Sequence, residues 1–212
     1  MSVAGNLAAI RQNIQRAGRN PDEVTIVAVT KGFGADVARE AVSAGLSILG
    51  ENRVHEALTK MAEVEGATWH LIGHLQTNKV KLTLGRFALI QSLDSAHLAE
   101  ALARQDRSQR VLVEVNVARE AQKSGVAPDG ALELIETVGG LVDVQGLMAM
   151  GPTHGDPRPA FEELGRIRSR AQERLGKALP ILSMGMSGDY EDAVRAGSTM
   201  VRLGTALFGP RS

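Results

Sequence analysis

The segment Val24-Thr-Ile-Val-Ala-Val29 runs directly into Thr30-Lys31-Gly32-Phe33-Gly34. Its first part is rich in β-branched and small apolar residues, which predicts a buried strand, and the glycines that follow predict a turn. The amphipathic stretch at 36–44 then predicts a helix, which Gly45 ends. A buried strand followed by a helix is the unit from which parallel sheets are built.

The same unit recurs along the chain, and a helical stretch follows each of the first seven candidate strands. The eight candidates lie near 24–30, 47–49, 69–72, 88–91, 110–116, 142–149, 180–183 and 199–203. Eight such strands fit either a closed (β/α)8 TIM-type barrel, which would be compact at 212 residues, or a large doubly wound sheet.

The two ends of the chain complete this expectation. No helix is predicted after the last strand, and the apolar stripe at 3–17 predicts a helix that would fill the vacant place in an outer ring. No linker, low-complexity segment or composition shift divides the sequence, so a single domain over residues 1–212 is expected.

The composition excludes several classes of protein. There are 24 basic and 24 acidic residues, and therefore none of the basic excess on which a non-specific nucleic-acid binder depends. The absence of cysteine excludes disulfides, thiolate zinc sites and cysteine nucleophiles. No apolar stretch approaches the roughly 18 residues of a membrane span. The first residues lack the pattern of a secretory signal, so a cytoplasmic protein is expected.

Lys31 closes the first strand, and in a barrel the carboxyl ends of the strands carry the functional groups. Its side chain could point to solvent, as most lysines do. It could instead point into the barrel mouth, where Gly32 and Gly34 would leave space around the amine. A lysine held there among apolar neighbours could form a Schiff base with a carbonyl compound.

Two loops that carry glycine and hydroxyl groups follow the last two strands: Leu182-Ser-Met-Gly-Met-Ser-Gly-Asp189 and Met200-Val-Arg-Leu-Gly-Thr205. Each has an ordinary explanation, because Ser187 or Asp189 could simply cap a helix and the second strand could simply stop at a turn. Together they indicate an anion site, since barrel enzymes often hold a phosphate between these two loops. A phosphorylated ligand is therefore expected.

Two further segments bring polar groups to the expected barrel mouth. One is Gly50-Glu-Asn-Arg-Val-His-Glu56, which follows the second strand. It contains Asn52 at a helix start, where capping is the default explanation. His74 follows the third strand. No metal site is expected, because His70, the nearest histidine, lies within that strand and no carboxylate cluster accompanies the pair.

Taken in this order, the segments resemble the YggS/PROSC-type pyridoxal 5′-phosphate homeostasis family over essentially the whole chain. The matching stretches are Val27-Ala-Val-Thr-Lys31, Gly50-Glu-Asn-Arg53, Trp69-His-Leu-Ile-Gly-His-Leu-Gln76 with Asn78-Lys79, Lys123-Ser-Gly125, and Leu182–Ser187 continuing into Ala196–Thr205. The resemblance implies a barrel similar to the N-terminal domain of alanine racemase.

The resemblance also implies that pyridoxal 5′-phosphate is carried as a Schiff base on Lys31. The cofactor-binding residues that it implies are Lys31, Asn52, His74, Met184, Ser187, Arg202, Gly204 and Thr205. Ser187 and the Gly204–Thr205 turn would hold the phosphate, Arg202 would lie beside the pyridine nitrogen, and Asn52 and His74 would line the ring. Lys123 is a candidate for a secondary contact. One departure is that the family often has a second lysine and a proline where this chain has Gly32-Phe-Gly34.

The function expected from this resemblance is a carrier that releases pyridoxal phosphate to apo-enzymes by transimination and acts as a monomer. The alternative is an amino-acid racemase on the same barrel, which would need a second base opposite Lys31. The only tyrosine, Tyr190, is expected to face solvent at the start of a helix, so it is a poor candidate for that base. A Schiff-base aldolase acting on a sugar phosphate would need a similar lysine and similar loops, and only the resemblance argues against it.

Overall fold

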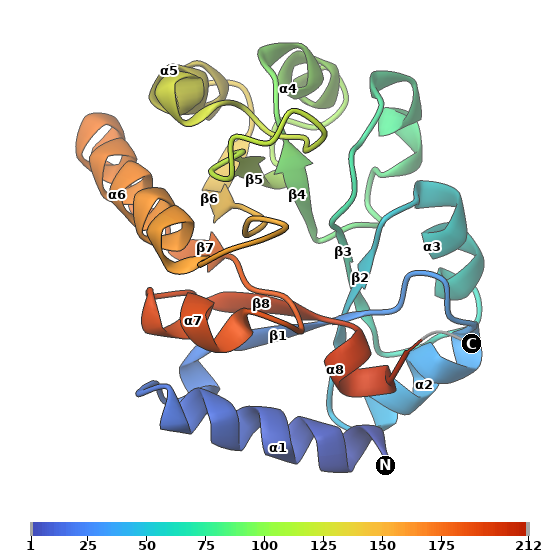
Figure 1. Ribbon diagram of the computed structural model, residues 1–212. Coiled ribbons are helices and arrows are strands. Elements are labelled where there is room, and N and C mark those ends of the chain that lie inside the picture. The colour runs from blue at the N-terminus through green and yellow to red at the C-terminus, as the bar shows by residue number, and fades with distance from the viewer. Residues whose placement is uncertain (1, 211–212) are drawn as a thin grey trace.

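Eight parallel strands form a closed barrel in the order of the sequence, and β8 pairs back with β1 (Figure 1). The computed structural model describes residues 2–210. The strands are β1 Thr25–Val29, β2 Ile48–Glu51, β3 Thr68–Leu71, β4 Leu89–Leu93, β5 Arg110–Glu114, β6 Asp143–Met148, β7 Ile181–Ser183 and β8 Met200–Leu203. The predicted barrel is thus confirmed, and each predicted strand is present with ends that differ by at most two residues.

Helices form a ring around the barrel (Figure 1). They are α1 Val3–Arg16, α2 Ala35–Ser43, α3 Val54–Met61, α4 Ala96–Ala103, α5 Pro128–Gly139, α6 Arg158–Leu175, α7 Tyr190–Arg195 and α8 Thr205–Phe208, with 3₁₀ helices η1 Pro21–Glu23 and η2 Thr77–Leu82. The expectation that no helix follows the last strand is wrong, because the four-residue α8 begins directly after Gly204. As predicted, α1 takes a place in the outer ring, where it contacts α2, α7 and α8.

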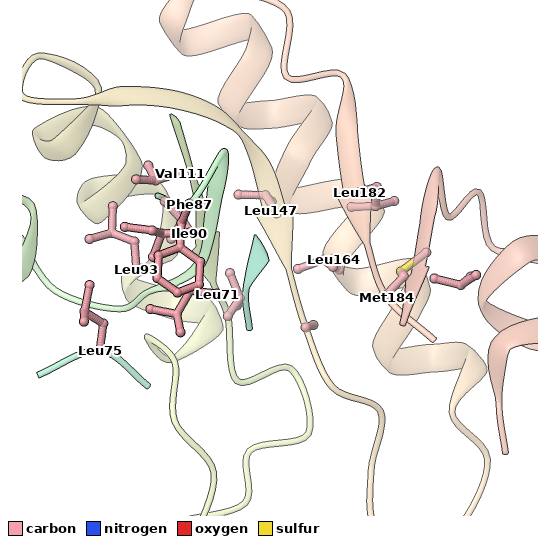
Figure 2. Packing of buried hydrophobic residues seen from close by; sticks show 14 of the residues in the cluster. Leu71, Leu75, Phe87, Ile90, Leu93, Val111, Leu147, Leu164, Leu182 and Met184 are labelled. Carbon is pink, nitrogen blue, oxygen red and sulfur yellow. The ribbon is translucent and has the colours of Figure 1, made fainter. Parts of the chain in front are cut away.

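Apolar side chains fill two separate regions, as the alternation of side chains along a strand requires. The larger cluster lies between the strands and the helices, and Figure 2 shows part of it around Leu71, Phe87 and Ile90. The smaller cluster consists of Val27, Leu89, Leu112, Met148 and Met200. In β1, Val27 belongs to the smaller cluster while its neighbours Ile26 and Ala28 belong to the larger one.

A chain of polar side chains also crosses the barrel interior. Gln91 Nε2 lies 3.1 Å from His70 Nδ1, and its Oε1 accepts a hydrogen bond of 2.7 Å from Ser183 Oγ. Burial, together with the charge of Arg110, lowers the pKa of His70 to about 4. His70 is therefore neutral at physiological pH, and it belongs to the barrel's internal hydrogen bonding.

Within residues 2–210, no helix is both long and apolar enough to cross a bilayer. In the same range, no three histidine, aspartate or glutamate side chains come together as a possible metal-binding group.

Candidate functional site

A cavity of about 510 Å³ opens at the carboxyl ends of the strands. Its walls are formed by Val29, Lys31, Asn52, Ile72, Gly73, His74, Glu114, Ser124, Met148, Met150, Met186, Ser187, Gly188, Arg202, Gly204 and Thr205. Seven of the eight residues singled out in the sequence are among them, drawn from the ends of β1, β2, β3 and β8 and from the loop after β7. A cavity of this size accommodates a small phosphorylated ring compound.

Met184 is the exception, because it is not among the residues that form the cavity wall. Its side chain is fully buried in the larger apolar cluster, close to Leu182 (Figure 2). Gly185 follows with a φ of +97°, which redirects the chain, and it is Met186 that lines the cavity, with 39% of its surface exposed. The sequence of Leu182–Ser187 does not reveal whether Met184 or Met186 faces the cavity, because the strand ends at Ser183 and the alternation of side chains ends with it.

The loops after β7 and β8 meet at one side of the cavity. Ser187 Oγ accepts a hydrogen bond of 3.0 Å from the Ala206 amide, and the Arg202 amide donates to the Gly185 carbonyl at 3.0 Å. Ser187 therefore connects the two loops and does not cap α7, whose N-cap residue is Asp189. Ser187 and Thr205 both line the cavity, and hydroxyl groups of this kind are what an anion site uses.

Arg202 lies at the floor of the cavity and is held by three hydrogen bonds to two residues. Its Nη1 donates to the Ser183 carbonyl at 2.9 Å and to Ser183 Oγ at 2.7 Å, and its Nη2 donates to the Ala149 carbonyl at 2.9 Å. Burial lowers its pKa to about 10, against the opposing effect of Glu114 and Asp189. Arg202 is therefore a fixed positive charge at neutral pH.

Glu114 is a cavity residue that the sequence analysis missed. It ends β5, which lies four strands from β1 in the eight-stranded ring, so it stands across the barrel mouth from Lys31. Only 3% of its surface is exposed, and burial, reinforced by Asp94 and opposed by Arg202, raises its pKa to about 7. The rule that drew attention to Lys31, a charged residue closing a strand, would have identified Glu114 as well.

Asn52 and His74 line the side of the cavity next to Lys31's strand. Asn52 does not cap α3, whose N-cap residue is Arg53. His74 is half-exposed, and its Nδ1 lies 3.1 Å from Asp94 Oδ2. Both side chains thus bring hydrogen-bonding groups to the cavity wall.

Two other residues from the sequence analysis lie outside the cavity wall. Lys123 Nζ donates to the Gly151 carbonyl at 2.6 Å and pairs with Glu120 Oε2 at 3.1 Å, so it joins two loops. Tyr190 is buried, and its hydroxyl accepts a hydrogen bond of 2.7 Å from Asn13 Nδ2. The expectation that Tyr190 faces solvent is wrong, because α1 packs over α7.

Comparison with known proteins shows what the barrel and its cavity are similar to. Residues 5–212 match the family described as alanine racemase, N-terminal domain. The pyridoxal phosphate homeostasis protein of Aquifex aeolicus is 42% identical over 97% of this chain and 95% of its own length. The protein of the same name from Escherichia coli K12 is 37% identical over 99% of this chain and 97% of its own.

Solved structures agree with the sequence relatives. PipY of Synechococcus elongatus, in its structure with pyridoxal phosphate bound, has a TM-score of 0.85 and 33% identity over 98% of this chain and 100% of its own. Alanine racemase of Corynebacterium glutamicum shares the fold, with a TM-score of 0.78 at 16% identity over 99% of this chain and 60% of its own. The chain therefore belongs to the alanine racemase N-terminal domain family and, within it, to the pyridoxal phosphate homeostasis proteins.

Proposed function

We propose that this protein binds pyridoxal 5′-phosphate in the cavity, holds it through Lys31, and releases it to apo-enzymes. The observation that carries the proposal is the convergence of the Lys31 strand end with the Ser187 and Thr205 loops on one cavity of about 510 Å³. The names of the relatives and the ligand in the PipY structure support the same assignment. A monomer located in the cytoplasm stays a prediction.

The residues present suit each part of this cofactor. When bound, pyridoxal phosphate supplies an aldehyde that condenses with a primary amine, with loss of water. Lys31 provides that amine, and the hydroxyls of Ser187 and Thr205, together with the backbone of Gly204, would hold the phosphate. Asn52 and His74 would flank the ring.

Arg202 favours a carrier over a catalyst of amino-acid chemistry. Its guanidinium donates hydrogen bonds and accepts none. It can therefore bind an unprotonated pyridine nitrogen, which is an acceptor, but it cannot stabilise a protonated pyridine nitrogen. An unprotonated ring is a weaker electron sink for a carbanion. Release needs no carbanion, because an incoming amine has only to replace the Lys31 amine.

The racemase alternative would need a second acid or base facing the cavity. Tyr190 cannot serve, since its hydroxyl is bonded to Asn13 under α1 in the outer ring. Glu114, across the barrel mouth from Lys31, is an acid or base that does face the cavity, so the preference for a carrier rests on Arg202 and on the names of the relatives.

The carrier function is tested by transfer of the cofactor. We expect the wild-type protein, loaded with pyridoxal phosphate and freed of excess by gel filtration, to restore activity to an apo-aminotransferase. Lys31→Arg keeps the positive charge but removes the primary amine, so after the same gel filtration it should restore little activity. If the two proteins restore the same activity, Lys31 does not hold the cofactor; if neither does, the delivery function is wrong.

A second prediction concerns Gly73, where the loops after β2 and β3 approach each other closely. A Cβ at this position would lie 2.4 Å from the Asn52 carbonyl oxygen and 2.8 Å from its Cα. Gly73→Ala should therefore displace Asn52 and lower the affinity for pyridoxal phosphate about tenfold, a cost typical of overpacking. Gly140→Ala, whose Cβ would meet nothing within 4 Å, is the control in the same fluorescence titration. An unchanged affinity for Gly73→Ala would place Asn52 away from the cofactor.

A further inference from the structure

A buried charged cluster lies directly behind Lys31, outside the cavity wall. It consists of Glu51 at the end of β2 and of Glu56 and Lys60 on α3, and we refer to it as the Lys60 cluster. Glu51 is fully buried and Lys60 is 5% exposed. Lys60 Nζ lies 2.6 Å from Glu51 Oε1 and 2.9 Å from Glu56 Oε1.

The cluster bonds to both chain neighbours of Lys31. On one side, Lys60 Nζ donates to the Thr30 carbonyl at 2.7 Å, and Thr30 Oγ1 donates to Glu51 Oε1 at 2.6 Å. On the other side, the Gly32 amide donates to Glu56 Oε1 at 2.6 Å. Gly32 has a φ of +75°, so this bond fixes the turn that begins directly after Lys31.

Fold stability alone does not account for such a cluster. Buried ion pairs are often no more stabilising than apolar side chains of similar volume, because each charge loses its hydration. Here all three protons of the Lys60 ammonium are used, yet Glu51 Oε2 is buried without a partner. What the arrangement does achieve is a set of directed hydrogen bonds that converge on residues 30 and 32.

We infer that the Lys60 cluster is a positioning device for Lys31, which fixes the backbone on both sides of it and so directs its amine into the cavity. This inference rests on the proposed function, since it concerns the formation of the bond between Lys31 and the cofactor. Thr30 is held by its carbonyl and its hydroxyl, and Gly32 by its amide, so the Cα of Lys31 lies between two anchored residues. Glu51, Glu56 and Lys60 act through the chain and do not themselves touch the cofactor.

The consequence is a separation between binding and bond formation. Misplacement of a reacting group by about 1 Å can slow a reaction by about a hundredfold. The residues of the Lys60 cluster do not form the cavity wall, so a change in the cluster leaves the surface that binds the ligand in place. Loosening the cluster should therefore slow the reaction of Lys31 with the aldehyde and leave the affinity for the rest of the molecule unchanged.

Two variants and two ligands test this separation. Lys60→Met removes the central charge. Glu56→Gln, at a partly exposed position, removes the carboxylate charge that holds the Gly32 amide and pairs with Lys60, and it is the variant less prone to misfold. For each folded variant, the rate of covalent attachment of pyridoxal phosphate is followed by absorbance. The affinity for pyridoxine 5′-phosphate, which lacks the aldehyde, is measured by calorimetry. Lys177→Met and Glu63→Gln, at exposed ion pairs, are the matched controls.

We expect both variants to attach pyridoxal phosphate about tenfold or more slowly than wild type, with wild-type affinity for pyridoxine 5′-phosphate and unchanged controls. A wild-type rate in Glu56→Gln, or a loss of affinity for pyridoxine 5′-phosphate equal to the loss in rate, would overturn the inference. A wild-type protein that binds the phosphate compounds but never reacts with the aldehyde would instead overturn the proposed function.

Discussion

Replacement of Arg202 by methionine is expected to lower the free energy of unfolding by about 1–3 kcal/mol, since this is the cost of one buried polar group left without a partner. The side chain donates three hydrogen bonds within the barrel, two to Ser183 and one to the Ala149 carbonyl. Methionine fills a similar volume but donates nothing, so the Ala149 carbonyl loses its donor while the Ser183 carbonyl keeps the Ala149 amide. Glu114 also loses the positive charge that opposes its pKa shift.

The measurement is equilibrium unfolding in urea of the protein without cofactor. Arg195→Met, at a half-exposed arginine of α7, is the control and should change stability by less than about 0.5 kcal/mol. If Arg202→Met unfolds at the wild-type urea concentration, Arg202 does not hold β6, β7 and β8 together. Its position at the floor of the cavity would then have to be revised.

Glu114→Gln is expected to stabilise the protein without cofactor at about pH 8 and to have little effect at about pH 5. Burial raises the pKa of Glu114 to about 7, from an ordinary value of 4.5. Between these values the folded state retains a proton that the unfolded state has lost, so the stability of the wild type falls as the pH rises. The loss is complete above pH 7 and amounts to roughly 3 kcal/mol at most.

Glutamine resembles the protonated carboxyl group, so the variant should not lose this stability. Thermal unfolding across the pH range should show a difference of roughly 5–10 °C between variant and wild type at about pH 8, and almost none at about pH 5. Asp94 and Arg202 are the charged groups that act on Glu114. Glu133→Gln, at an exposed position of α5, is the control. A difference that is the same at both pH values would show that Glu114 titrates in its ordinary range.

The barrel itself could be predicted from the sequence because its strands are buried on both faces. Runs such as residues 24–29 and 110–115 are therefore nearly continuous in β-forming residues, and each is followed by a helix with a clear apolar stripe. The site could be located for a related reason, since the carboxyl ends of parallel strands meet at one edge. This rule predicts that Lys31, Ser187 and Thr205 lie at the same edge, and all three line the cavity.

The parts that were missed depend on packing between distant segments. Tyr190 is buried because α1, more than 170 residues away in the sequence, lies over it and supplies Asn13. Met184 and Met186 have the same chemistry, and only the turn at Gly185 decides which one reaches the cavity. Glu51, Glu56 and Lys60 have the appearance of a charged helix start in the sequence. Their convergence on residues 30 and 32 depends on how α3 packs against β2, beside the turn that follows β1.

The central claim is that Lys31 is the residue that holds the cofactor, and one measurement tests it most directly. The protein is incubated with pyridoxal phosphate, reduced with borohydride, digested and mapped by mass spectrometry. The account predicts a single reduced phosphopyridoxyl group on the peptide that contains Lys31, and its loss in Lys31→Arg. Attachment at another lysine, with Lys31 unmodified, would contradict it.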